Sequence, residues 1–373
     1  MEKEKRYMLR ALALAERAKG LTHPNPMVGC VIAKGNKIIS EGFHTRFGAA
    51  HAEVEALKKA GQKAKGACLY VNLEPCAHFG KTPPCTDAII KSGIKKVFIA
   101  MHDPNPINNG KGAKMLESSG IKVKSGICEN QAKDLNASFI KYITKGSPFV
   151  TLKMAQSLDG KIATKTGDAS WISSASSRRL VHLWRKQADA VMVGAGAVLK
   201  DDPLLTARTG DRNQKPKGRQ PIKIIVDSGL KIPLSAKIFS KKSPAKTIII
   251  TSKNAPKNKI RALLNKKNTE ILAFDSRDGK INLKNAMKLL AKKGIINIMI
   301  EGGGELTGSA LTQGIVDKVL FFVAPKIIGG RSAKTSVEGD GVGRAADALT
   351  IKNLTVEKIG PDYLFTGEPC LQA

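Results

Sequence analysis

Short apolar runs alternate with longer stretches of helical apolar spacing along the first 146 residues. A helical pattern over residues 3–19 ends at Gly20, and two β-rich segments then flank Gly35-Asn36, a hairpin signal. Further elements are predicted as a helix after His51, a second helix that starts at Pro83-Pro84-Cys85, strands at 68–73 and 96–101, and helical stretches near 111–118 and 129–143. Strands that alternate with helices indicate a layered α/β domain with helices on both faces of a sheet.

A second set of elements begins after Gly146-Ser147-Pro148, whose turn composition predicts a domain boundary. We therefore expect two domains, residues 1–146 and 147–373. The second starts with a strand at 149–154 and a helix at 175–187, and it ends with a helix and strands. Its other strands are predicted near 189–193, 222–226, 246–251, 270–274 and 296–300.

The length of 373 residues suits two cores better than one, and 42% hydrophobic residues support globular folding. No apolar run approaches the ~18 residues of a membrane span, and the amino terminus lacks the apolar centre of a signal peptide. We expect a cytoplasmic protein without membrane contact. In that compartment cysteines serve as metal ligands or buried thiols, and four of the six are expected to be structural: Cys30, Cys68, Cys128 and Cys370.

Lysine and arginine outnumber aspartate and glutamate by 62 to 31, a net charge of +31. Such a charge suits nucleic acid or an anionic substrate. The basic residues are scattered, however, and aromatic residues make up only 5%, which leaves little material for stacking bases. The pattern disfavours nucleic acid and retains phosphorylated small molecules as partners, while the oligomeric state stays open and a homo-oligomer is compatible with it.

One stretch of the first domain carries metal-site spacing: His51 and Glu53 at a helix start, then Cys76 and Cys85, each preceded by proline. One imidazole and two thiolates suit Zn²⁺, and three protein ligands leave a fourth position for the water that reacts. Glu53 lies two residues from the histidine and is placed to take and return a proton. This H-x-E…P-C…C pattern is the signature of zinc deaminases. His78, between the cysteines, is the rival ligand.

The second domain carries a weaker signal, an apolar strand that ends in Glu301 and is followed by Gly302-Gly303-Gly304 and a helix start. Glycines at a helix start let the backbone approach an anion, and the exposed N–H groups bind it. The segment therefore suggests phosphate binding. It differs from the dinucleotide fingerprint of a Rossmann domain, which normally follows an early strand.

These residues resemble the RibD family of bifunctional riboflavin biosynthesis proteins over nearly the whole chain. The likeness lies in the motifs PNPMVGCVI, HAEVEAL and EPCAHFGKTPPC of the first half, and KMAQSLDGKIA, DDPLLTAR, EGGGELTG and VDKVLFFVAPKIIGG of the second. Eight residues separate Cys76 from Cys85, whereas nucleic-acid and nucleoside deaminases have the compact C-x-x-C. The long spacing is similar to the riboflavin branch.

The resemblance implies a cytidine-deaminase-like three-layer domain followed by a dihydrofolate-reductase-like α/β domain. In the first, His51, Cys76 and Cys85 would bind Zn²⁺, and Glu53 would transfer protons. Asn25, His44 and Lys81 match positions that line the deaminase pocket, with Lys81 suited to a substrate phosphate.

In the second domain the resemblance implies an NADPH site and a substrate site. The NADPH contacts would be Ala155, Trp171, Ala197, Asp201, Ser228, Gly303, Gly304, Glu305, Leu306, Thr307, Gly308 and Ser309. The substrate contacts would be Ala169, Arg185, Leu205, Arg208 and Glu301. Ala169 and Ala197 stand where hydroxyl residues are expected, so hydrogen bonds there would come from backbone or from Ser170. Both arginines are expected to anchor phosphate or ribose.

The implied reaction deaminates 2,5-diamino-6-(5-phosphoribosylamino)pyrimidin-4-one and then reduces its ribosyl chain with NADPH, giving 5-amino-6-(5-phosphoribitylamino)uracil. The sequence names no single acid for the reduction and leaves Lys153, Asp201 and Glu301 as candidates. Two alternatives stay open: a tRNA or DNA base deaminase with a basic appendage, and a binding module with structural zinc. The second domain argues against the first alternative.

Overall fold

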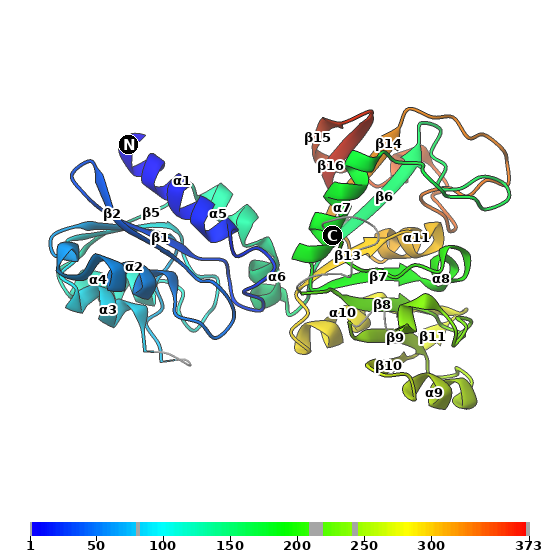
Figure 1. Cartoon of the computed structure of the whole chain (residues 1–373), viewed down its shortest axis with the longest axis horizontal. Helices are drawn as coiled ribbons and strands as arrows, with labels where there is room; N and C mark the ends of the chain where they lie inside the picture. Colours follow the sequence, from blue (N-terminus) through cyan, green and yellow to red (C-terminus); the bar gives the residue numbers. More distant parts are fainter. Residues whose placement is uncertain (1, 80–82, 209–218, 241–244, 371–373) are drawn as a thin grey trace. The chain divides into compact units, whose positions relative to one another are not determined.

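The chain folds as two compact units, residues Met1–Ser147 and Pro148–Ala373. The computed structural model describes residues 2–79, 83–208, 219–240 and 245–370. Figure 1 shows both units, each built around its own sheet.

The first unit contains a five-stranded sheet in the order β2-β1-β3-β4-β5. β1 pairs antiparallel with β2 and β3, whereas β3, β4 and β5 run parallel. The predicted hairpin at Gly35-Asn36 is confirmed by the β1–β2 pair. The strands are β1 (Gly29–Lys34), β2 (Lys37–Phe43), β3 (Cys68–Leu73), β4 (Lys96–Met101) and β5 (Lys122–Ser125).

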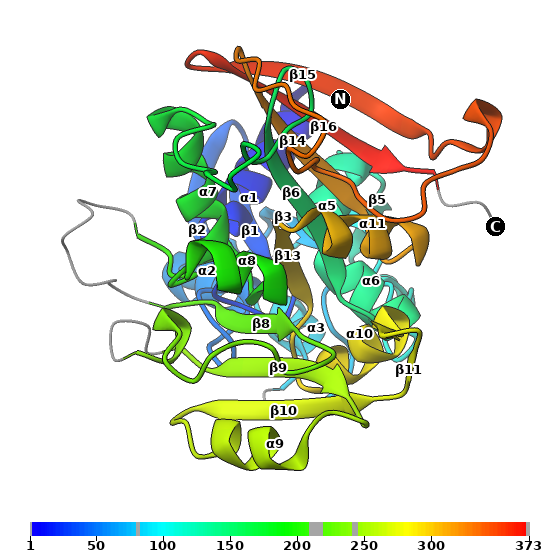
Figure 2. The same ribbon diagram turned by 90° about the vertical axis from the view of Figure 1, so that its right-hand side faces the viewer.

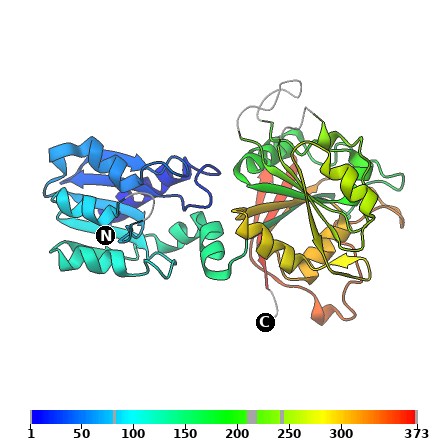
Figure 3. The same cartoon turned by 90° about the horizontal axis from the view of Figure 1, so that it is seen from below.

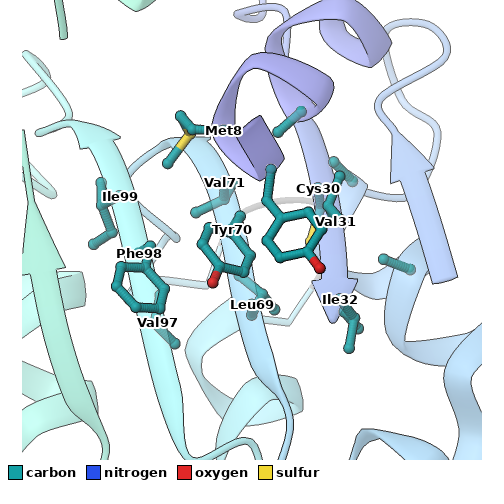
Figure 4. Packing of buried hydrophobic residues seen from close by; sticks show 14 of the residues in the cluster. Met8, Cys30, Val31, Ile32, Leu69, Tyr70, Val71, Val97, Phe98 and Ile99 are labelled. Atoms are coloured by element: carbon teal, nitrogen blue, oxygen red, sulfur yellow. The ribbon is translucent and has the colours of Figure 1, made fainter. Parts of the chain in front are cut away.

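Helices cover both faces of this sheet (Figure 1). α1 (Glu2–Glu16) and α5 (Glu129–Leu135) pack on one face, and α2 (Ala52–Ala60), α3 (Cys85–Lys91) and α4 (Lys111–Ser118) lie on the other. Strand side chains pack beneath α1, where the Tyr70 ring stacks on Phe98 with centroids 4.6 Å apart (Figure 4). The three-layer arrangement expected from the resemblance is confirmed.

One predicted helix is two helices in the structure. The stretch 129–143 divides at Asn136 into α5 and α6 (Ala137–Lys145). The Asn136 side chain accepts a hydrogen bond from the Met27 N–H at 2.8 Å and donates one to the Met27 carbonyl oxygen at 3.0 Å. The break between α5 and α6 places the buried Asn136 amide where it pairs with backbone groups of a loop distant in sequence. The spacing of apolar residues along a helix cannot reveal such a contact.

The second unit contains a nine-stranded sheet in the order β10-β9-β8-β7-β13-β6-β14-β16-β15. All strands from β10 to β14 in this order run parallel, and β16 and β15 add an antiparallel edge. The strands are β6 (Phe149–Ser157), β7 (Ala190–Gly194), β8 (Ile222–Val226), β9 (Thr247–Ser252), β10 (Thr269–Phe274), β13 (Asn297–Glu301), β14 (Lys318–Ala324), β15 (Ile351–Ile359) and β16 (Asp362–Pro369), with a separate hairpin β11 (Ser276–Arg277) and β12 (Lys280–Ile281).

Helices flank this sheet on two sides (Figures 2 and 3). α10 (Leu283–Lys292) and α11 (Gly304–Thr312) pack on one face, where Ile224 and Ile248 point. α7 (Ala175–Gln187), α8 (Ala195–Asp201) and α9 (Lys257–Leu264) pack on the other, where Ile225 and Ile249 point. The side chains of adjacent residues in a strand thus pack into the cores on opposite faces of the sheet. This two-sided burial explains why the strands are continuous apolar runs. Turns of 3₁₀ helix cover Gly61–Ala64, Lys237–Phe239 and Ala345–Asp347.

None of the helices within the described ranges is long and apolar enough to cross a membrane.

Candidate active sites

Three segments of the first unit meet beyond the carboxyl ends of β3 and β4. β3 leads into Glu74-Pro75-Cys76, α2 begins directly after His51, and α3 begins at Cys85. Because β3 and β4 are parallel neighbours, the loops after both strands share one edge of the sheet. The fold therefore joins side chains that are up to 34 positions apart, His51 and Cys85.

The predicted metal ligands are brought together. The His51 Nδ1, Cys76 Sγ and Cys85 Sγ atoms all lie within 4.8 Å of one another. Nδ1 is 3.1 Å from the Cys85 sulfur and 3.7 Å from the Cys76 sulfur. An ion at ~2.0 Å from nitrogen and ~2.3 Å from sulfur in tetrahedral geometry separates such atoms by roughly 3.5 Å. The donor set therefore fits Zn²⁺ in type and spacing.

The pKa values of Cys76 and Cys85 shift in opposite directions. The hydrogen bond from the Cys85 thiol lowers the pKa of Cys76 to about 4, and hydrogen bonds from His51 and the Cys85 backbone N–H act in the same direction. The Cys76 thiolate and burial raise the pKa of Cys85 well above its usual value. One thiolate is thus available before a cation arrives, and a cation between the sulfurs would displace the remaining proton.

Glu53 lies on the first turn of α2 with its side chain buried and 3% exposed. Its Oε2 atom has no hydrogen-bond partner among the described residues. Burial raises the pKa of Glu53 to about 7, although the nearby His51 lowers it. A carboxyl with this pKa can both accept and return a proton near neutral pH.

His44 lies next to the predicted ligand His51 and contacts Asn25. The His44 ring is 5.5 Å from the His51 ring in an edge-on arrangement. Its Nδ1 lies 3.1 Å from the Ala50 carbonyl oxygen, and its Nε2 lies 3.3 Å from Asn25 Nδ2. Burial lowers the pKa of His44. A neutral ring that donates from Nδ1 and accepts at Nε2 satisfies both contacts.

Two other positions were predicted for this site, Lys81 and His78. Lys81 lies outside the described residues. His78, the rival ligand, does not belong to the metal-spaced group of described residues. Its Nδ1 is buried without a hydrogen-bond partner among the described residues.

The second unit contains a cavity of about 2020 Å³ at the carboxyl ends of β6, β7, β8 and β13. A crevice at this edge of a parallel sheet is the usual ligand site of an open α/β fold. Its volume has room for a dinucleotide beside a second ligand. All the residues that the resemblance assigned to NADPH and substrate line this cavity except Thr307.

Thr307 is buried, with 0% exposed, and its Oγ1 donates a hydrogen bond to the Met154 sulfur at 3.4 Å. Its side chain therefore packs in the core beneath the cavity, and its assignment as a side-chain contact to NADPH is not supported. The helical geometry of α11 explains why Thr307 differs from its neighbours. Successive side chains of a helix point in different directions, so they cannot all face the cavity.

The glycines just before and within α11 are required for two different reasons. Gly302 and Gly303 adopt positive φ of 78° and 86°, which the turn into α11 requires. A Cβ at Gly304 would lie 2.6 Å from the Thr335 carbonyl oxygen, and one at Gly308 would lie 1.7 Å from the Glu338 carbonyl oxygen. Close packing against this neighbouring segment, rather than approach of an anion, accounts for the last two glycines.

A buried ion cluster forms one wall of the cavity. Arg185 donates through Nε and Nη2 to the two oxygens of Glu301 at 2.6 and 2.8 Å, and Lys153 Nζ lies 3.9 Å from Glu301 Oε2. Lys153 and Glu301 are direct neighbours across β6 and β13. Burial, followed by the Arg185 charge, lowers the pKa of Lys153, although Glu301 raises it. Arg185 thus faces the cavity as part of an ion pair, which the sequence did not predict.

Sequence reasoning missed His182, which lines the same wall and accepts a hydrogen bond at Nδ1 from the Arg208 backbone N–H at 3.3 Å. Burial, then Arg185 and Arg208, lower the pKa of His182 to about 4, so the ring is neutral at physiological pH. Its position one turn before Arg185 on α7 was the available signal.

Comparison with known proteins gives a family model for each unit. Residues 1–101 match the model of the cytidine and deoxycytidylate deaminase zinc-binding region, and residues 148–365 match the RibD C-terminal domain. The riboflavin biosynthesis protein RibD of Aquifex aeolicus is 46% identical over 363 residues, which cover 97% of this chain and 98% of that protein. That of Bacillus amyloliquefaciens is 42% identical over 369 residues, with coverage of 98% and 96%.

The chain belongs to the RibD family.

Solved structures of this family give the same result. RibD of Acinetobacter baumannii superposes with a TM-score of 0.87 at 36% identity. The diaminohydroxyphosphoribosylaminopyrimidine deaminase/5-amino-6-(5-phosphoribosylamino)uracil reductase of Thermotoga maritima superposes with a TM-score of 0.85 at 37% identity. Each comparison covers 99% of both chains. The family and fold expected from the sequence are confirmed, and the chain is a bifunctional enzyme of riboflavin biosynthesis, a deaminase with zinc and a reductase with NADPH.

Proposed function

We propose that residues 1–147 deaminate 2,5-diamino-6-(5-phosphoribosylamino)pyrimidin-4-one and that residues 148–373 reduce the ribosyl chain of the product with NADPH. The product would be 5-amino-6-(5-phosphoribitylamino)uracil. The observation that carries the first half is the convergence of one imidazole and two sulfurs beside a buried carboxyl. The family relationship along the full chain supports the combination of the two activities in one chain.

His51, Cys76 and Cys85 would hold the zinc through Nδ1 and the two Sγ atoms. Zinc, when bound, supplies the Lewis acidity that makes water a nucleophile near neutral pH. Glu53 takes the proton that the water gives up and delivers it to the departing amine, for which a pKa near 7 is suited. We assign His44 and Asn25 to the adjoining pocket wall, where His44 Nε2 holds the Asn25 amide and that amide presents hydrogen-bonding groups to a pyrimidine.

In the second unit NADPH, when bound, supplies the hydride. We assign Lys153 as the residue that delivers the accompanying proton, because burial, together with the Arg185 charge, lowers its pKa and thereby eases loss of the proton. Glu301 orients Lys153 and neutralises Arg185. Arg208 lines the cavity beside this cluster and is assigned to the substrate phosphate, since a guanidinium matches oxyanions in a bidentate manner.

We also infer a cytoplasmic location. All six cysteines of the chain are free, as expected where thiols are kept reduced. The substrate phosphate fits the excess of positive charge better than nucleic acid does.

A coupled assay tests the proposal. The full chain with the pyrimidine phosphate and NADPH should release ammonia and oxidise NADPH in a one-to-one ratio once the concentration of the first product is constant. Ammonia release without any NADPH oxidation, together with tight binding of tRNA, would support a nucleic-acid deaminase instead.

A further inference from the structure

A buried amide spans the two peptide groups on either side of Cys76. Asn108, with 0% exposed, accepts a hydrogen bond at Oδ1 from the Ala77 N–H at 2.9 Å and donates from Nδ2 to the Pro75 carbonyl oxygen at 3.3 Å. Nδ2 also donates to Asp103 Oδ2 at 3.2 Å, which uses the second amide hydrogen and fixes which way the amide faces.

Glu74 secures the start of the same turn. Its buried carboxylate accepts hydrogen bonds from the backbone N–H groups of Asp103, Gly110 and Ala113, each at 3.0 Å. Ala113 belongs to the first turn of α4, where N–H groups lack partners within the helix and a negative charge is favoured. The chain before Cys76 is thereby held to α4.

α4 also approaches the turn at van der Waals distance. A Cβ at Gly112 would lie 2.0 Å from the Pro75 carbonyl oxygen, so only glycine permits this packing. Glycine weakens a helix relative to alanine, and the close approach is a direct reason for its presence here. On the far side, the Cys76 carbonyl oxygen accepts hydrogen bonds from the Thr86 N–H and Oγ1, each at 3.2 Å.

Every contact of Asn108 on this turn is to the backbone beside Cys76, and Cys76 contributes one of the three converging donor atoms. A metal ligand has to be held within a fraction of an ångström, and its supporting shell sets that precision. Among the described residues, Asn108 is the side chain that contacts both flanking peptides at once.

We propose that Asn108 is a positioning residue of the deaminase: it fixes the backbone around Cys76 so that the sulfur meets His51 Nδ1 and the Cys85 sulfur before the metal binds. This inference rests on the proposed role of Cys76 as a zinc ligand. The side-chain hydrogen bonds of Asn108 run to the backbone on both sides of Cys76 and to Asp103, so Asn108 acts through Cys76.

The test compares Asn108→Ala with Asn109→Ala in the full chain. Asn109 is the neighbouring residue, of the same type but exposed, and it provides the matched control. Transfer of Zn²⁺ to a chromogenic chelator should be 10- to 100-fold more favourable for Asn108→Ala than for wild type, the usual effect of losing a supporting contact, and unchanged for Asn109→Ala. NADPH oxidation by the second unit should be equal in all three proteins.

Cobalt substitution separates positioning from general destabilisation. With Co²⁺ as the probe, Asn108→Ala should change the thiolate-to-metal absorption bands, whereas a variant that is only less stable keeps them. Gly112→Ala, which pushes the Pro75 carbonyl group from the other side, should change the same bands and decides the question if Asn108→Ala does not fold. The inference would be overturned if Asn108→Ala and Gly112→Ala both retained zinc as the wild type does and both showed the cobalt absorption bands of the wild type. Failure of the wild type to bind Zn²⁺ would instead overturn the proposed site.

Discussion

Replacement of Glu301 by glutamine should destabilise the second unit strongly. The Glu301 carboxylate is 8% exposed, binds the Arg185 guanidinium at 2.6 and 2.8 Å, and lies 3.9 Å from Lys153 Nζ. Glutamine keeps the shape but removes the charge, and it leaves two buried cations without their counter-ion. Breaking a buried pair in this way costs about 3–5 kcal/mol.

The pH dependence has a definite sign. Burial alone would raise the pKa of Glu301, but the Arg185 charge and hydrogen bonds, followed by Lys153, hold it below its usual value. A carboxyl with a lowered pKa in the folded state stabilises the fold above the pKa of the unfolded chain, and this stabilisation is lost as the pH falls below it. The difference between wild type and Glu301→Gln should therefore be complete at pH 7 and decrease below about pH 4.5.

Urea unfolding followed by tryptophan fluorescence measures this difference, because both tryptophans, Trp171 and Trp184, lie in the second unit. Asp275→Asn is the control: Asp275 is 87% exposed and pairs with an exposed Lys253 at 2.9 Å, so its loss should change the unfolding free energy by less than about 1 kcal/mol. The reasoning would be refuted if Glu301→Gln lowered the unfolding free energy by as little as the control does. It would also be refuted if the loss of unfolding free energy were equal at pH 4 and pH 7.

Three further predictions concern the reactions. Glu53→Gln should keep its zinc and should still oxidise NADPH with the deaminated substrate, but it should release ammonia at least ~100-fold more slowly, and normal ammonia release would remove Glu53 from the mechanism. Arg208→Ala should raise the KM of the deaminated substrate more than the Kd of NADPH, and the opposite order would assign this guanidinium to the cofactor. Residues 148–373 alone should bind NADPH more tightly than NADH in a fluorescence titration, and equal affinities would contradict the cofactor choice.

Local sequence patterns predicted the elements that place the sites. The hairpin at Gly35-Asn36, the helix after His51 and the helix at 175–187 depend on nearby residues, and the structure contains all three. The short edge strand β5 was missed, because Lys122–Ser125 has one half-buried residue and no apolar run. Sequence patterns also missed α8 and α10, which follow Gly194 and Asn282.

The site residues likewise divide into those that the sequence predicted and those that it missed. Ligand types and spacing predicted the cluster of His51, Cys76 and Cys85, since each residue carries its chemistry in its side chain. The network that supports them was hidden, because Asn108 reaches Cys76 across 32 positions through backbone groups that every residue has. Likewise, the sequence assigned Arg185 to an anion without showing that Glu301 already occupies its guanidinium.

Zinc content tests the central claim most directly. Metal analysis of the purified full chain should give about one Zn²⁺ per chain, as a single tetrahedral site requires. Cys76→Ser and Cys85→Ser should each lose both the metal and ammonia release, while the second unit still oxidises NADPH when the deaminated substrate is supplied. One Zn²⁺ per chain retained in both variants would show that His51, Cys76 and Cys85 are not the ligands of the catalytic metal.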